Sequence, residues 1–560
     1  MRRALAGLVC VVASGCVTGR FPTQEELLKV RERPAPANVF DQKQVDPDRW
    51  ELRGPLAEAV ELVQHRGATP WDGLVDDAVR ARAGLLFPAE SMHCVARETG
   101  VYYLAKQALP GERLAPFIAT RCGSPVSQVD RAWVTAELHE GASDDEAFHF
   151  LEEKARSLLE QQSRGNRIAG LWFGREGRRA IVTIVTTPRA AILERIPLAS
   201  AGAVELRGEL LQPAASVRAI VNRGANGFAR CTVDDTITLP RFHVRCDVDA
   251  GDASTWVELA AFPPGRILGS HVVELLAFPG GAPSSVFELP AAPATTATGS
   301  TPLERMTAAV NQVRAEAGLT PLVLSTRESE AATAVAPHYF AALMGGEPET
   351  VADTISLGVR AGWAIEGEVR QGMMASGIST AGDDLVSLVR LVVERPVGRE
   401  VLLDPAARQL ALGTVVAAGH AAAALFATYS FFEGGHGGDV QTVLGRLGEA
   451  RARRGLPAPT ALSGMGGPLA RAVKRLVAGE SSTSSALQDV LDGASATLSR
   501  PVQGFYLEIS DLADLQFPEE LLARSTADVA ITVCHYKPSG EPWARLVVLI
   551  VVASNGMNAI

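Results

Sequence analysis

Apolar positions along the chain recur with helical spacing in some stretches and with strand-like spacing in others. The clearest helical stretch spans residues 302–317, and its apolar residues lie three and four positions apart on one face: Met306, Ala309, Val310, Val313 and Ala317. Thr301 has the capping-box spacing to Glu304, and Pro302 suits the first helical position. Gly318 suits a left-handed helix end. The pattern predicts an amphipathic helix that begins at residue 302.

Strand-like patterns occur in two settings. Three segments show strand, glycine-containing turn and strand: residues 168–187, 408–432 and 527–552. Residues 188–288 instead contain short β-rich pieces separated by turn residues, which is typical of a β-sandwich. The apolar run at 546–553 is far shorter than the roughly 18 residues of a membrane span, so it predicts a buried strand.

The length of 560 residues indicates several domains, because single cores stop growing near about 250–300 residues. A Pro-, Ala- and Thr-rich linker at 289–301 is the clearest boundary. The predicted parts are a signal peptide at 1–16, a tether at 17–48, an N-terminal α+β domain at 49–187, the β-sandwich at 188–288, and further domains at 302–432 and 439–560. A net charge of −10 argues against a nucleic-acid-binding protein, which normally has a basic face.

The N-terminus has the order of an export signal. Arg2 and Arg3 precede an apolar run at 4–13, and small residues then lead to Cys16. This resembles a bacterial lipoprotein signal peptide, which implies that Cys16 carries a lipid and anchors the protein to the cell envelope. No Asp follows Cys16, which in lipoproteins favours the outer membrane. An ordinary secretory signal is the alternative.

The remaining cysteines fit an oxidising compartment. Cys231 and Cys246 flank two β-rich pieces around a turn, and Cys94 and Cys122 bracket a helical stretch, so each pair is expected to form a disulfide. Cys534 is left over in an apolar strand. There we expect a buried, inert thiol rather than a nucleophile.

The stretch "VNQVRAEAGLTPLVLSTRESEAATAVA" carries a family resemblance. It resembles the first helices of the CAP superfamily, the cysteine-rich secretory, antigen 5 and pathogenesis-related proteins, also called SCP-like domains. The matching residues are Asn311, Arg314, Gly318, Leu319 and Leu322, with Gly367-Glu368 and residues 410–416 as later matches. The resemblance covers about 301–432 and implies an α-β-α sandwich.

Part of this pattern returns later in the chain. Arg451, Gly455, Leu456 and Pro459 repeat the helix ending, and residues 527–552 repeat the closing strands. We therefore expect a second, diverged CAP-like unit at 439–560, with "EGGHGGD" as the joint. The sequence leaves open whether 49–187 is a third. The predicted fold class is multidomain α+β, with duplicated CAP-like units and an intervening β-sandwich.

The family's complete cavity holds two His and two acidic residues that bind a divalent metal. Here Glu368 remains as one acid, while Gly398 stands where the second His belongs and the first would fall near residues 349–350. The candidate cleft residues are Glu368, His338 and Arg399, although His338 also fits an Ala-rich helix, and Arg395 and Arg399 resemble solvated charges. We expect no catalytic residue, metal or other cofactor.

Two further histidine-containing stretches have alternative interpretations. The set His139, Asp144, Asp145 and His149 could bind a metal, but Ser143 and Glu146 favour a capped helix start. His436 is expected in a linker. No nucleophile elbow, zinc-protease motif or phosphate-binding loop is present in the sequence.

Two functions remain compatible with the sequence. The preferred one is a non-enzymatic envelope lipoprotein that binds a protein, glycan or lipid partner and no nucleic acid. The alternative is a metal-assisted hydrolase or peptidase of the CAP type that uses Glu368.

Overall fold

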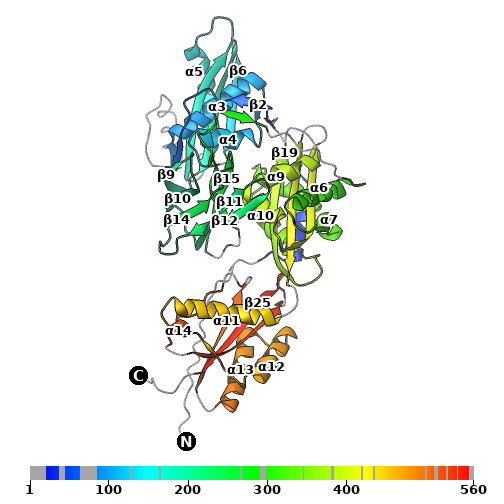
Figure 1. The fold of residues 1–560 in the computed structure, drawn as a ribbon. Helices are drawn as coiled ribbons and strands as arrows, with labels where there is room; N and C mark the ends of the chain where they lie inside the picture. Colours follow the sequence, from blue (N-terminus) through cyan, green and yellow to red (C-terminus); the bar gives the residue numbers. More distant parts are fainter. Residues whose placement is uncertain are drawn as a thin grey trace. The chain divides into compact units, whose positions relative to one another are not determined.

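The computed structural model describes residues 21–553 with internal gaps. The gaps are residues 37–43, 63–84, 127–128, 163–165, 265, 267, 290–297, 345, 380–383, 418–420, 433–435, 499–500, 510–511, 513–514, 525–526 and 539. Cys16, the signal peptide and most of the 289–301 linker therefore lie outside the described residues. The chain divides into two compact units, one made of residues 25–356 and 374–428, the other of residues 1–24, 357–373 and 429–560. The multidomain α+β class is confirmed (Figure 1).

The N-terminal sheet has the strand order β4-β7-β8-β6. Its strands are β4 (Leu85–Pro88), β6 (Asp130–Glu137), β7 (Asn166–Glu176) and β8 (Arg179–Pro188). Its helices are α3 (Glu90–Lys106), α4 (Leu114–Arg121) and α5 (Asp144–Gln162). Leu151, Ala155 and Leu159 lie at helical spacing on α5 and are fully buried with Leu171 and Ile184 of the sheet, so one apolar face fixes the helix to the strands.

Two sheets form the sandwich, with the orders β13-β14-β10-β9-β3 and β12-β11-β15-β16. Their strands are β3 (Ala59–Leu62), β9 (Ala191–Pro197), β10 (Ala203–Leu210), β11 (Ser216–Arg223), β12 (Gly227–Arg230), β13 (Thr232–Val233), β14 (Arg241–Asp247), β15 (Thr255–Phe262) and β16 (Ser270–Ala277). Leu206 and Val244 of one sheet and Val257 and Leu275 of the other lie in one buried core. The edge strand β3 comes from the segment that the sequence assigns to the preceding domain.

The second half of the chain contains two further four-stranded sheets, ordered β18-β20-β21-β19 and β22-β24-β25-β23. The strands are β18 (Val323–Leu324), β19 (Val369–Ser379), β20 (Ala407–Ala417), β21 (Ala421–Phe431), β22 (Thr460–Ala461), β23 (Val502–Ile509), β24 (Asp528–Tyr536) and β25 (Arg545–Ala553). The helices are α6 (Pro302–Glu316), α7 (Thr326–Leu343), α8 (Glu349–Ala361), α9 (Leu385–Val393), α10 (Pro396–Leu402), α11 (His436–Ala452), α12 (Gly466–Val477), α13 (Thr483–Thr497) and α14 (Glu519–Leu522).

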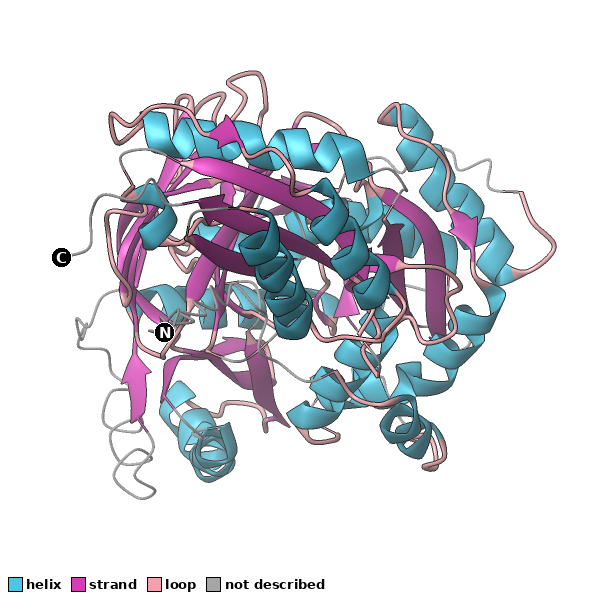
Figure 2. Ribbon diagram, turned by 90° about the horizontal axis from the view of Figure 1, so that it is seen from below, coloured by secondary structure: helices cyan, strands magenta, loops and turns pink. Residues whose placement is uncertain are grey.

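The buried strand expected at 546–553 is confirmed as β25, and its unbroken apolar run has a structural reason. Val547 and Leu549 pack with residues of α12 and α13, whereas Val548 and Ile550 pack with residues of α11 and α14. Figure 1 shows these helices beside the strands of the C-terminal sheet, and Figure 2 shows helices lying across strands in a second view. Since helices cover both faces, every position from Leu546 to Ala553 is buried.

The three four-stranded sheets outside the sandwich share one connectivity. In chain order, the first strand lies beside the third, the third beside the fourth, and the fourth beside the second. The first strand runs parallel to the third in each case, and a helix follows the first strand directly. The N-terminal segment thus has the same strand connectivity as the two segments with CAP-like sequence patterns.

The repeated helix ending corresponds to one repeated arrangement. Arg314 and Arg451 have no solvent exposure, and each Nε donates at 2.8 Å to the carbonyl six residues ahead, on Thr320 and Pro457 respectively. Gly318 and its counterpart in the repeat, Gly455, both have a φ of 71°, which favours glycine. Each of these buried arginines therefore holds the end of its helix to the chain that follows it, and we name them the buried arginine clamps. The capping box predicted before residue 302 is also confirmed.

The segment expected to be a tether contains regular structure. Helix α1 (Gln24–Arg31) buries Leu27 and Val30, and Arg33 forms an ion pair with Glu347 at 2.7 Å. Two short two-stranded sheets follow: β1 (Gln44–Val45) pairs with β5 (Leu109–Pro110), and β2 (Arg49–Glu51) pairs with β17 (Val286–Glu288). Contacts with distant parts of the chain therefore hold the described residues of this segment in place. Local composition does not reveal such contacts.

Candidate binding site

The candidate site centres on residues 394–400, which we name the docking segment. Asp384 caps α9 through a bond from the backbone of Val386, and Pro396 occupies the first turn of α10. A Cβ on Gly398 would lie 1.8 Å from the carbonyl oxygen of Val392. The close approach of these two backbone segments leaves no room for a side chain where the CAP pattern places its second His.

Arg395 of the docking segment contacts the sandwich instead of solvent. Its guanidinium lies 3.8 Å from the centre of the Trp256 ring and 2.6 Å from Oε1 of Glu274. It also donates to the carbonyl of Glu112 at 3.2 Å. The expectation of a solvated charge was wrong, because the sandwich supplies an aromatic face and a carboxylate.

Arg399 is only 9% exposed, so the expectation for it was also wrong. Its Nε donates to the carbonyl of Val393, and its Nη1 donates to the carbonyls of Gly224 at 3.0 Å and Gly227 at 2.7 Å. Burial lowers the pKa of this guanidinium to about 10. Arg399 thus connects the docking segment by hydrogen bonds to the loop that follows β11.

The acidic residues of the docking segment are paired too. Glu394 contacts Arg113 at 2.8 Å, and its carbonyl accepts a 2.8 Å bond from Nδ2 of Asn222. Burial raises the pKa of the Glu394 carboxyl. Glu400 is 4% exposed and contacts both Arg218 and Arg230 at 3.2 Å. Each end of the segment is therefore held by charged groups of the same compact unit.

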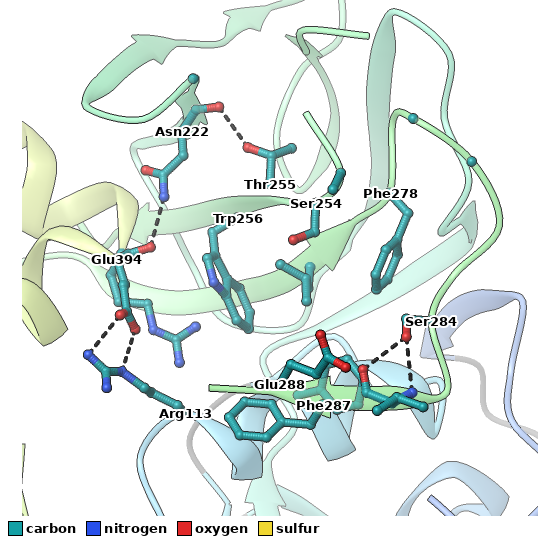
Figure 3. Close-up of a pocket in the computed structure, with 18 of the residues that line it drawn as sticks. Arg113, Asn222, Ser254, Thr255, Trp256, Phe278, Ser284, Phe287, Glu288 and Glu394 are labelled. Atoms are coloured by element: carbon teal, nitrogen blue, oxygen red, sulfur yellow. Dashed lines mark hydrogen bonds and ion pairs between the residues drawn. The ribbon is translucent and has the colours of Figure 1, made fainter. Parts of the chain in front are cut away.

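A cavity of about 670 Å³ lies beside this contact (Figure 3). Figure 3 shows Trp256 and Phe278 facing one space, with Phe287 and Glu288 across it. Phe117, Ser254, Ser284 and a glycine-rich turn at 279–282 complete much of the lining. Asn222 donates its amide to Glu394 and so fixes the wall at the docking segment.

A second cavity of about 330 Å³ also has Arg395 in its lining. Its charged lining consists of Glu112, Glu258, His271, Glu274 and Arg395. His271 contacts Glu258 at 2.7 Å, and this negative charge raises the pKa of the imidazole to about 9. Burial raises the pKa of Glu112. Sequence reasoning missed this cluster because its members come from separate elements and form no local motif.

The other candidate cleft residues lie elsewhere. His338 on α7 is 1% exposed, and its Nδ1 lies 2.6 Å from Oε1 of Glu347. Glu368 is exposed immediately before β19. Neither residue lines the cavity that contains Arg399. The three side chains therefore do not share that cavity.

The structure also locates the two other histidine-containing stretches. Ser143 and Glu146 form the reciprocal bonds of a capping box at α5, as predicted. Within the described ranges, no three His, Cys, Asp or Glu side chains gather as a metal-binding group. His436 begins α11, so its assignment to a linker was wrong.

The cysteine predictions agree with the structure. Cys94 is bonded to Cys122 and Cys231 to Cys246. Cys534 is a free, buried thiol, and burial raises its pKa to about 11. A thiol with so high a pKa is protonated at neutral pH, which fits an inert role. Among the described helices, none has both the length and the hydrophobicity that a bilayer crossing requires.

The comparisons with known proteins include one weak structural likeness. No protein-family model matches the chain, and no curated protein matches it. Among solved structures, the chain is similar to a cysteine-rich secretory protein from Staphylococcus aureus, with 11% identity and a TM-score of 0.15 over 46% of this chain and 85% of that one. At this TM-score the likeness carries no argument about fold or activity.

Proposed function

We propose that the protein is an exported, lipid-anchored envelope lipoprotein that binds a ligand without catalysing its conversion. One observation carries the non-catalytic part of this proposal. Residues 394–400 correspond to the CAP cleft motif, and their side chains contact the sandwich. Arg395 contacts Trp256 and Glu274, and Arg399 donates to two backbone carbonyls.

The remaining cleft candidates support the same function. Gly398 has no side chain and no room for one, and the His338 imidazole is already paired with Glu347. A catalytic metal needs several ligands with free lone pairs around an open position. In this proposal, the CAP-like unit holds a wall of the cavity beside Trp256, and the cavity binds the ligand.

Export and anchoring have separate support. The order of charged, apolar and small residues before Cys16 resembles a lipoprotein signal, and the two disulfides fit an oxidising compartment. The outer membrane is the proposed site because no Asp follows Cys16.

A hydrolysis assay on the full-length protein in detergent tests the non-catalytic role. The wild type, Glu368→Ala and the neighbouring exposed control Glu366→Ala are incubated with a peptide mixture, with and without added Zn²⁺, and products are identified by mass spectrometry. We expect equal, background-level cleavage by all three proteins. Cleavage that disappears in Glu368→Ala and persists in Glu366→Ala would overturn the proposal in favour of a metal-assisted hydrolase.

A further inference from the structure

The 670 Å³ cavity beside Trp256 has a lining that selects one chemical class of ligand. We propose that it binds a neutral saccharide, with pyranose rings against its aromatic side chains. This inference rests on the binding role proposed above and adds the site and the ligand class. The volume falls within the range of roughly 300–1,000 Å³ that small-molecule sites occupy.

The charges of the lining argue for a ligand without net charge. Five charged side chains line the cavity, and each is already paired: Arg113 with Glu394, Arg395 with Glu274, Arg399 with backbone carbonyls, and Glu288 with Arg49. A charged ligand would compete with these partners for the same side chains. A neutral ligand leaves every pair intact.

The apolar part of the lining is aromatic. Trp256, Phe278 and Phe287 surround the space in Figure 3, and Phe117 packs on Phe287 with ring centroids 5.7 Å apart. Arg395 contacts the Trp256 ring and fixes its position. Flat, immobilised rings match the C–H faces of pyranose sugars, and their few rotatable bonds lower the entropy cost of binding.

The polar part of the lining includes oxygen acceptors that a ligand can use. Glu288 and Glu394 keep carboxylate lone pairs beyond their arginine bonds, and the Ser254 side chain is exposed at the rim. A Cβ built on Gly281 would meet nothing within 4 Å, so a ligand can approach the backbone there. Sugar hydroxyls donate to such acceptors, whereas an acyl chain would leave them unsatisfied.

The test measures saccharide binding by the full-length protein in a detergent without a sugar headgroup. The probes are cellotetraose, maltotetraose and the neutral tetramer of N-acetylglucosamine, with tetragalacturonate and the glucosamine tetramer as anionic and cationic counterparts. Calorimetry supplies the affinity. We expect at least one neutral tetramer to bind with a Kd of about 1 mM or tighter, and more tightly than both charged probes.

Three variants locate the site. Ser254→Trp places bulk in the cavity and should weaken binding roughly tenfold or more, whereas Ser254→Ala should change it less than about threefold. Ser216→Trp adds the same bulk at an exposed serine outside the lining and should leave the affinity unchanged. Circular dichroism spectra that match the wild type show that the variants are folded.

Three results would overturn the inference: no neutral tetramer binds, a charged probe binds best, or Ser254→Trp binds as the wild type does. The peptide assay keeps these results distinct from failure of the proposed function. If the protein binds no saccharide and cleaves no peptide, the proposed ligand class is wrong and the proposed non-catalytic role stands.

Discussion

Glu258 and Glu274 lie directly opposite each other in the antiparallel pair of β15 and β16. Like charges at such a position destabilise a sheet. Two cations offset the repulsion: His271 contacts Glu258 at 2.7 Å, and Arg395 of the docking segment contacts Glu274 at 2.6 Å. The sandwich is thus electrostatically incomplete without the docking segment.

Replacing Arg395 should therefore destabilise the protein. Arg395→Leu removes the contact with Trp256 and the ion pair with the poorly exposed Glu274 carboxylate, for an expected loss of about 3 kcal/mol. Urea unfolding measures it. Arg327→Leu, at an exposed position on α7, should change the free energy of unfolding by less than about 0.5 kcal/mol. Equal effects of the two substitutions would contradict the assigned contacts of Arg395.

The stability of the same region should fall at alkaline pH. The negative charge of Glu258 raises the pKa of His271 from its usual 6.5 to about 9 in the folded protein. Stabilisation by this imidazolium is complete below pH 6.5 and is lost as the pH rises through 9. The side chain is half-exposed, so solvent screening reduces the effect. The melting temperature should decline less between pH 6.5 and 9 in His271→Gln than in the wild type; identical slopes would refute the assignment.

The buried arginine clamps should be structurally essential in both repeats. Arg314→Met leaves the carbonyls of Thr320, Leu402 and Asp404 without this donor, and the expected cost is about 3 kcal/mol. The exposed Arg305 on the same helix provides the control, since Arg305→Met should cost less than about 0.5 kcal/mol. Denaturant titration compares the two variants. The same replacement at Arg451 should be similarly damaging, and a neutral result at either clamp would contradict its role.

The disulfide pattern is open to direct mapping. Peptides from the unreduced protein should contain the Cys94–Cys122 and Cys231–Cys246 links and a free Cys534. Replacing Cys231 and Cys246 together by Ser should cost about 3 kcal/mol, because the bond closes a loop of 15 residues. A peptide that joins either of these cysteines to Cys534 would refute the assigned pairing.

Membrane attachment should depend on Cys16. Cys16→Ser should abolish lipid labelling and move the protein from the membrane fraction to the soluble fraction, since the resemblance places the lipid on this thiol. Cys10→Ser, a change within the apolar run of the signal, should leave both properties intact. Membrane retention of an unlabelled Cys16→Ser protein would refute the anchoring proposal.

Local patterns in the sequence predicted local structure well. The helix after Thr301 was predictable because its cap, apolar face and terminal glycine are neighbours in sequence. The docking segment was not: Arg395 resembles a surface charge until Trp256 and Glu274 are brought to it from more than a hundred residues away. Strand β3 was missed for the same reason, since its pairing with β9 is long-range.

The three sheets with a shared connectivity differ in the segment between their second and third strands. Between its second and third strands, the N-terminal sheet has the 19-residue helix α5, the next has α9 and α10 with the docking segment, and the last has the four-residue helix α14. This connection can therefore lengthen, shorten or acquire a contact surface while the strand order persists. Evolution could specialise each sheet through this one connection, and protein engineers could graft new recognition elements at the same point.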